Sequence, residues 1–228
     1  MSLTAYGADD TPSEHTDPTP PSLRRLRRDE LSTDVVSTAR HLLGTLLVRD
    51  DGDERLVARI VETEAYAGPE DRASHARAGR TARTAVMFGP PGYAYVYLVY
   101  GLHHCLNVVC GPDGEAAAVL IRAGAPLSGL AGMRERRGRS AGPDERLAAG
   151  PARTCQALGI DRQLDGLDLV TDERLWLARD PAGPPDAADI VSGPRIGVDY
   201  ADPEWSARPW RFGLAASPAL SRPFRGAG

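Results

Sequence analysis

The stretch YAYVYLVYGLHHCLN, residues 93–107, places two runs of strand-forming residues on either side of Gly101. Aromatic and β-branched residues favour strands, and a glycine between two such runs favours a hairpin turn. We therefore predict a strand over 93–100 and a return strand over 105–110. Because side chains alternate along a strand, Tyr100 would face away from the other three tyrosines of this run, Tyr93, Tyr95 and Tyr97.

A second stretch, VETEAY at residues 61–66, ends a longer predicted strand over 55–66. Alternation puts Glu62, Glu64 and Tyr66 on one face of it. Glu64 is a candidate general base, because a carboxylate can deprotonate water and stabilise positive charge developing on a sugar. A single glutamate in a strand more often forms an ordinary ion pair than acts as a catalytic base. The neighbouring tyrosines favour the catalytic role for Glu64.

The remaining chain mixes helical and strand patterns. Periodicity predicts helices over 33–43, 129–137 and 151–158. Further strands are expected over 45–49, 116–122, 195–198 and 210–214. Because this order lacks βαβ repeats, we predict an α+β fold with a mainly antiparallel, curved β-sheet, flanking helices and a protruding β-hairpin.

Length and composition indicate one domain in the 228 residues. Residues 1–22, rich in Pro, Thr, Asp and Ser, are predicted to be a disordered leader, the domain to span 23–220, and 221–228 to be a C-terminal tail. No apolar run suits a membrane span or signal peptide, so we expect a cytoplasmic protein, associated with the nucleoid if bacterial. The cysteines fit no zinc pattern and are expected to be reduced and buried: Cys105, Cys110 and Cys155.

Charge is distributed unevenly along the chain. The net charge of −4 argues mildly against a nucleic-acid partner, yet residues 72–139 contain nine arginines and only three acidic residues. Such a basic face attracts phosphate within about 8–10 Å at physiological salt. A solvated, arginine-rich surface is the alternative. The sequence contains no lysine, so no side-chain amine is available for Schiff-base chemistry.

Five of the seven tyrosines lie between Tyr66 and Tyr100, which a dispersed core would not produce. One carboxylate beside several flat rings suits an enzyme that lifts a base out of DNA, stacks it, and directs water at the sugar carbon behind it. A tyrosine ladder in a sheet is the structural alternative. His75 alone would more often be a surface or core histidine, and the sequence shows no metal partner for it.

These residues together resemble the alkyladenine DNA glycosylases, also called mammalian-type 3-methyladenine or N-methylpurine DNA glycosylases. Several separated matches are far more specific than one short motif. They occur in the same order, are densest from 59 to 129, and comprise Glu62-Thr63-Glu64-Ala65-Tyr66, Met87-Phe88, Tyr95-Val96-Tyr97, Tyr100-Gly101, Asn107 and Val119-Leu120-Ile121-Arg122-Ala123.

The resemblance implies a monofunctional base-excision-repair glycosylase that flips alkylated or deaminated purines from duplex DNA and leaves an abasic site. The substrate would be 3-methyladenine, with hypoxanthine, ethenoadenine and 7-methylguanine as further candidates. Glu64 would activate the water, with Arg122 beside it, and Tyr100 would enter the minor groove to fill the gap in the stack. The flipped purine would lie between the rings of Tyr66, His75 and Tyr97.

Asn107 matches an amide of the pocket floor that, by the same resemblance, clashes with the exocyclic amino group of guanine. The resemblance implies no metal and no organic cofactor. The expected partner is double-stranded DNA containing damaged purines, bound by a monomer.

Two other classes of function are weighed against this one. A damage-sensing DNA-binding protein without catalysis would need Tyr100 and the arginines but not Glu64. A nucleoside hydrolase would need neither an exposed wedge nor a basic face. Salt separates these classes, because affinity for DNA falls steeply as salt rises.

Overall fold

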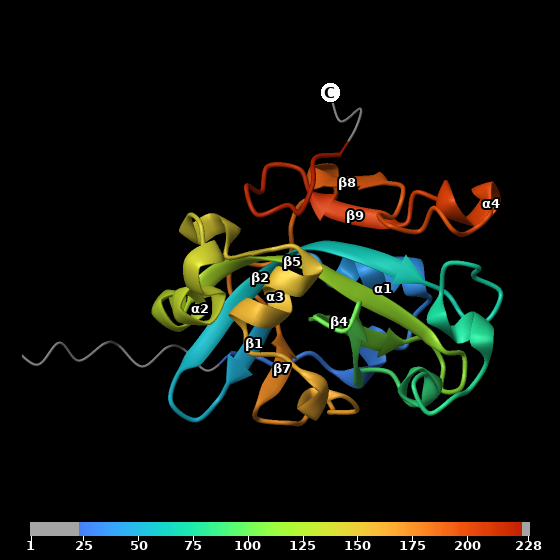
Figure 1. Ribbon diagram of the computed structural model, residues 1–228, viewed down its shortest axis with the longest axis horizontal. Helices are drawn as coiled ribbons and strands as arrows, with labels where there is room; N and C mark the ends of the chain where they lie inside the picture. Colours follow the sequence, from blue (N-terminus) through green and yellow to red (C-terminus); the bar gives the residue numbers. More distant parts are fainter. Residues whose placement is uncertain (1–22, 225–228) are drawn as a thin grey trace, which may run out of the picture.

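The computed structural model describes residues 23–224, and its strands form one nine-stranded sheet (Figure 1). The main path runs β3-β4-β5-β2-β1-β7, with β6 beside β5 and β9 between β2 and β8. Each pairing within it is antiparallel. The strands are β1 Leu46–Asp50, β2 Arg55–Tyr66, β3 Ala94–Val99, β4 His103–Cys110, β5 Ala117–Ser128, β6 Ala148–Ala149, β7 Leu175–Ala178, β8 Ile190–Gly193 and β9 Arg211–Leu214.

Helices flank this sheet, and α3 packs against β4, β5 and α2 (Figure 1). Asp34 caps α1 by accepting hydrogen bonds from the backbone of Val36 and Ser37. The main apolar core packs α1 and α3 against the inner strands through such residues as Leu42 and Leu158. The helices are α1 Val35–His41, α2 Leu130–Arg137, α3 Pro151–Ala157 and α4 Pro203–Ser206, with short 3-10 turns at Arg28–Leu31, His75–Ala78, Ala85–Phe88, Gly138–Ser140, Asp144–Arg146, Arg162–Leu164 and Ala187–Asp189.

The centre of the sheet is the long pair β2–β5, and it is bent. Its register shifts after Val57 and again on both sides of Glu62. Such bulges bend a strand and increase its twist, which gives the sheet its curvature. On its other edge β2 pairs with β1 up to Arg59 and with β9 from Glu62 to Glu64. Both glutamates therefore lie where β2 passes from one neighbour to the next.

The predicted α+β class, single domain and antiparallel sheet with flanking helices are confirmed, as are the helices expected over 33–43, 129–137 and 151–158. The three cysteines are free and buried, as predicted. In residues 23–224 no helix is long and apolar enough to cross a membrane. The expected leader, 1–22, lies outside the described residues. Ser221, the first residue of the expected tail, contacts Glu62 of β2.

The strand predicted over 195–198 is wrong, because these residues form a loop. Its apolar residues alternate as in a strand, yet the polar groups bond elsewhere: the Arg195 side chain pairs with Asp71, and the Ile196 N–H donates to Glu64. Gly197 has a φ of 76°, which a continuing strand cannot accommodate. The strand of this region is β8, which ends two residues earlier.

Candidate active site

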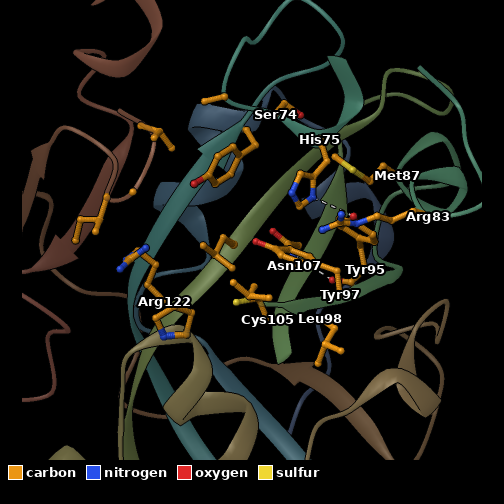
Figure 2. Close-up of a pocket in the computed structure, with 18 of the residues that line it drawn as sticks. Ser74, His75, Arg83, Met87, Tyr95, Tyr97, Leu98, Cys105, Asn107 and Arg122 are labelled. Carbon is orange, nitrogen blue, oxygen red and sulfur yellow. Dashed lines mark hydrogen bonds between the residues drawn. The ribbon is translucent and has the colours of Figure 1, made fainter. Parts of the chain in front are cut away.

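A cavity of about 490 Å³ opens beside the β3–β4 hairpin (Figure 2). Its walls come from β2, β3, β4 and β5, from the loop and 3-10 turns over 73–87, and from the loop over 196–200. The structure brings most of the predicted site residues to this one cavity: Tyr66, His75, Tyr97, Tyr100, Asn107 and Arg122 all line it. Glu64 does not line it and lies beneath it.

Glu64 is fully buried, and its carboxylate is held from three sides. Its Oε2 accepts a hydrogen bond from the Tyr66 hydroxyl at 2.8 Å and faces Arg122 Nη1 at 3.1 Å. Its Oε1 accepts one bond within the described residues, from the backbone N–H of Ile196 at 2.7 Å. A carboxylate oxygen can accept about two hydrogen bonds, so Oε1 retains acceptor capacity for a water. All three donors belong to residues that line the cavity.

Arg122 joins the two buried glutamates of β2. Its Nε contacts Glu62 Oε1 at 3.1 Å, while Nη1 contacts Glu64. Burial lowers the pKa of Arg122, but the charges of Glu64 and Glu62 outweigh that effect, so its pKa is raised and it stays cationic. Glu62 is satisfied on the far side by Arg211 at 3.3 Å and by the backbone and hydroxyl of Ser221 at 2.6 and 2.8 Å. The network therefore offers Glu64, not Glu62, to the cavity.

His75 meets the tyrosines of β3 across the cavity. Its ring lies edge-on to Tyr97 with centroids 4.5 Å apart, and its Nδ1 is 3.1 Å from the Tyr95 hydroxyl (Figure 2). Burial lowers the pKa of His75 to about 4, and the nearby positive charges of Arg83 and Arg77 contribute. His75 is therefore neutral at pH 7, so its ring adds no positive charge to the cavity.

The tyrosine hydroxyls of the cavity are neutral donors as well. Burial raises the pKa of Tyr66, and the charge of Glu64 raises it further. Burial also raises the pKa of Tyr97 well above its ordinary value, and the neighbouring Cys105 raises it further. Asn107 is fixed by its Nδ2, which donates to the Tyr95 carbonyl at 3.1 Å. Its amide is thus a rigid part of the cavity wall (Figure 2).

Tyr100 stands at the tip of the β3–β4 hairpin on the edge of the cavity. Its side chain is 93% exposed, and its φ is 51°, followed by 71° at Gly101. Two successive positive φ values are what a tight hairpin turn uses, but a bulky residue is disfavoured in that conformation. An exposed ring in a strained position contributes little to folding, so its placement needs a reason outside the folded chain.

The loop over 194–202, which holds Glu64 through the Ile196 N–H, was missed from the sequence. Arg195 and Asp71 are both fully buried and form a two-bond ion pair at 2.5 and 3.0 Å. The Arg195 guanidinium also lies 4.8 Å from the Tyr66 ring centroid. Five further residues that the sequence did not single out as site residues line the cavity: Arg83, Met87, Tyr95, Cys105 and Tyr200. Of these, only Tyr95 had a signal in the sequence, because strand alternation places it on the same face as Tyr97.

No group of three or more metal-binding side chains occurs within residues 23–224. What the site offers is a buried carboxylate with spare acceptor capacity beneath a cavity walled by neutral rings. This arrangement can activate water next to a flat ligand.

Comparison with known proteins gives one consistent result. The methylpurine-DNA glycosylase family matches residues 29–218. A relative from Anaeromyxobacter dehalogenans, named a 3-methyladenine DNA glycosylase, is 52% identical over 195 residues, which are 85% of this chain and 84% of the relative. One of the same name from Streptomyces avermitilis is 46% identical over 207 residues, 90% of this chain and 94% of its own.

The similarity extends to a mammal. The DNA-3-methyladenine glycosylase of Mus musculus is 45% identical over 208 residues, covering 86% of this chain and 61% of the mouse protein. The match includes the strands that carry the cavity residues, because residues 29–218 contain β1 to β9. The chain is a member of the methylpurine-DNA glycosylase family.

Proposed function

We propose that this protein is a monofunctional DNA glycosylase that hydrolyses the N-glycosidic bond of alkylated purines in duplex DNA and leaves an abasic site. Its family membership supports a glycosylase for alkylated purines. The observation that carries the proposal is the buried Glu64 carboxylate, which is hydrogen-bonded to residues that line a cavity walled by aromatic rings. The exposed Tyr100 stands at the edge of the same cavity. The substrate is 3-methyladenine, and hypoxanthine, ethenoadenine and 7-methylguanine are further candidates.

The flipped purine is held between Tyr66, His75 and Tyr97. Ring faces of tyrosine are negative, so a cationic alkylpurine gains roughly 0.5–2 kcal/mol per contact. The low pKa of His75 supports this role, because a protonated histidine would repel the same cation. Asn107, held by its bond to the Tyr95 carbonyl, stands where the exocyclic amino group of guanine would clash, which places 7-methylguanine, with the same amino group, below 3-methyladenine as a substrate.

Glu64 acts as the general base. Water at Oε1, beside the Ile196 N–H, loses its proton to the carboxylate and attacks C1′ as the bond to the purine breaks. Arg122 keeps the carboxylate in place through its ion pair. A 3-methylated adenine already carries the positive charge that makes it a good leaving group. Because the sequence has no lysine, strand cleavage through a Schiff base is not expected.

Tyr100 fills the space that the purine vacates. Extrusion of a base costs a few kcal/mol, and an inserted side chain offsets part of it. The exposure of Tyr100 at the hairpin tip supports this role.

The test is base release from methylated duplex DNA and from a duplex with one hypoxanthine, with strand breaks measured before and after alkali. We expect the wild type to release base, with breaks only after alkali. Glu64→Gln should lose about 10²- to 10⁴-fold in single-turnover rate.

Glu62→Gln is the matched control, since it removes the other carboxylate bound to Arg122, and the remaining partners of Glu62, Arg211 and Ser221, do not line the cavity. It should lose much less activity per folded molecule than Glu64→Gln. Equal losses would show that both act only by positioning Arg122. Tight binding of damaged duplex without any release by the wild type would instead favour a non-catalytic damage sensor.

A further inference from the structure

Four exposed arginines lie in the segment that forms one wall of the cavity: Arg72, Arg77, Arg80 and Arg83. None of them is within ion-pair distance of a carboxylate among residues 23–224, although Arg27, Arg55 and Arg174, also exposed on the surface, each have such a partner. Two of the four, Arg77 and Arg83, are also close to rings of the cavity.

Arg83 reaches back into the cavity. Its guanidinium lies 5.4 Å from the centroid of the Tyr97 ring, and Figure 2 shows its side chain extending toward His75 and Tyr95. It therefore places an uncompensated positive charge against a ring that would hold a cationic base. At an effective dielectric constant of 20, two like charges repel by about 2 kcal/mol at 8 Å. The charge of Arg83 needs an anion when such a base is bound.

Arg77 stands over a second exposed ring at the edge of the cavity. Its guanidinium is 5.6 Å from the centroid of Tyr200, whose side chain is 60% exposed. The Tyr200 hydroxyl donates to the Ala73 carbonyl at 2.8 Å, which fixes the ring upright against the loop that leads to His75. Tyr200 lies on the loop over 196–200, whereas the exposed Tyr100 lies on the β3–β4 hairpin. The cavity edge thus carries two exposed tyrosines from separate elements.

We infer that Arg77 and Arg83 clamp the backbone phosphates on either side of the flipped nucleotide, and that the Tyr200 ring packs against the deoxyribose between them. The inference rests on the proposed function, because the anion it requires is the DNA backbone. Arginine donors match phosphate oxygens in geometry and charge. Bound phosphate neutralises Arg83, so the cavity accepts a cationic base only as part of a DNA strand.

The test measures binding rather than catalysis, on a duplex carrying a stable abasic analogue. For the wild type, Arg77→Gln, Arg83→Gln and the double variant, the dissociation constant is measured from 50 to 300 mM salt. Each lost phosphate contact should reduce the slope of log affinity against log salt by about 0.9, and the double variant should lose about 1.8. Arg24→Gln is the control, because Arg24 is exposed and does not line the cavity, and its slope should match that of the wild type.

Tyr200→Ala should weaken binding with no change in slope. Tyr200→Phe keeps the ring but loses the bond to the Ala73 carbonyl, so it should weaken binding less than Tyr200→Ala does. Slopes for Arg77→Gln and Arg83→Gln equal to that of Arg24→Gln would overturn the clamp. Base release by the wild type is assayed separately, so failure of the clamp is distinguishable from failure of the glycosylase proposal.

Discussion

Replacing Tyr100 by asparagine should change stability and activity in opposite directions. A non-glycine residue in the left-handed region costs about 1–2 kcal/mol, and asparagine tolerates that region better than tyrosine does. The Tyr100 side chain is 93% exposed, so its removal sacrifices little buried surface. We therefore expect Tyr100→Asn to raise the free energy of unfolding by roughly 0.5–1 kcal/mol.

Activity should fall because the wedge is lost. If the ring offsets about 1–3 kcal/mol of the cost of extrusion, the single-turnover rate falls by about 5- to 150-fold on a stably paired lesion. The loss should shrink when the same lesion is placed in an unpaired bulge, since such a base is already partly unstacked. Urea unfolding and single-turnover base release on both duplexes measure the two effects.

Two outcomes would contradict these expectations for Tyr100. A lower unfolding free energy in Tyr100→Asn would mean that the φ of 51° is not a strain that asparagine relieves. An unchanged rate on the paired lesion would remove the ring from base extrusion, whatever happens to stability.

Two further predictions concern buried groups. In the unfolded chain His75 has its ordinary pKa of 6.5, whereas in the folded chain its pKa is about 4. The neutral His75 therefore contributes to stability above pH 6.5, and this contribution is lost as the pH falls toward 4. Because the ring is partly exposed, we expect a loss of about 1 kcal/mol from pH 7 to 5 in urea unfolding, and His75→Gln should lack it. Asp71→Asn leaves the fully buried Arg195 without its counter-charge and should lower the unfolding free energy by about 3–5 kcal/mol, whereas a loss under 1 kcal/mol would contradict a dry ion pair.

Strand periodicity alone predicts which residues of β2 and β3 share a face, whereas only the family resemblance points to Asn107 and Arg122. Alternation along β2 predicts that Glu62, Glu64 and Tyr66 share a face, and in the structure Tyr66 donates to Glu64 while Arg122 contacts both glutamates. Period two along β3 likewise groups Tyr95 with Tyr97, whose ring centroids are 5.4 Å apart. These relations are local, so a repeat of two residues determines them.

The contacts that hold the site residues in place could not be predicted from strand periodicity. The ion pair between Arg195 and Asp71 joins residues 124 apart, and no local pattern specifies such a pairing. The alternation over 195–198 even predicted a strand, because it cannot distinguish a ladder from a loop whose polar groups bond to distant side chains. The Ile196 N–H that holds Glu64 was missed for the same reason.

Several side chains around the cavity lack an interaction partner within the part of the folded chain that the structure describes. Tyr100 is exposed and strained, Arg77 and Arg83 have no carboxylate partner among residues 23–224, and Glu64 retains an acceptor position beneath an open cavity. Each lowers stability or contributes nothing to it unless a ligand supplies the missing partner. A damaged purine and its water would fill the cavity, but only a stacked duplex can receive Tyr100, and only a phosphate backbone can pair with both arginines. A free nucleoside supplies the purine but neither the stacked duplex nor the phosphate backbone. The site as a whole is therefore better matched to DNA than to a nucleoside.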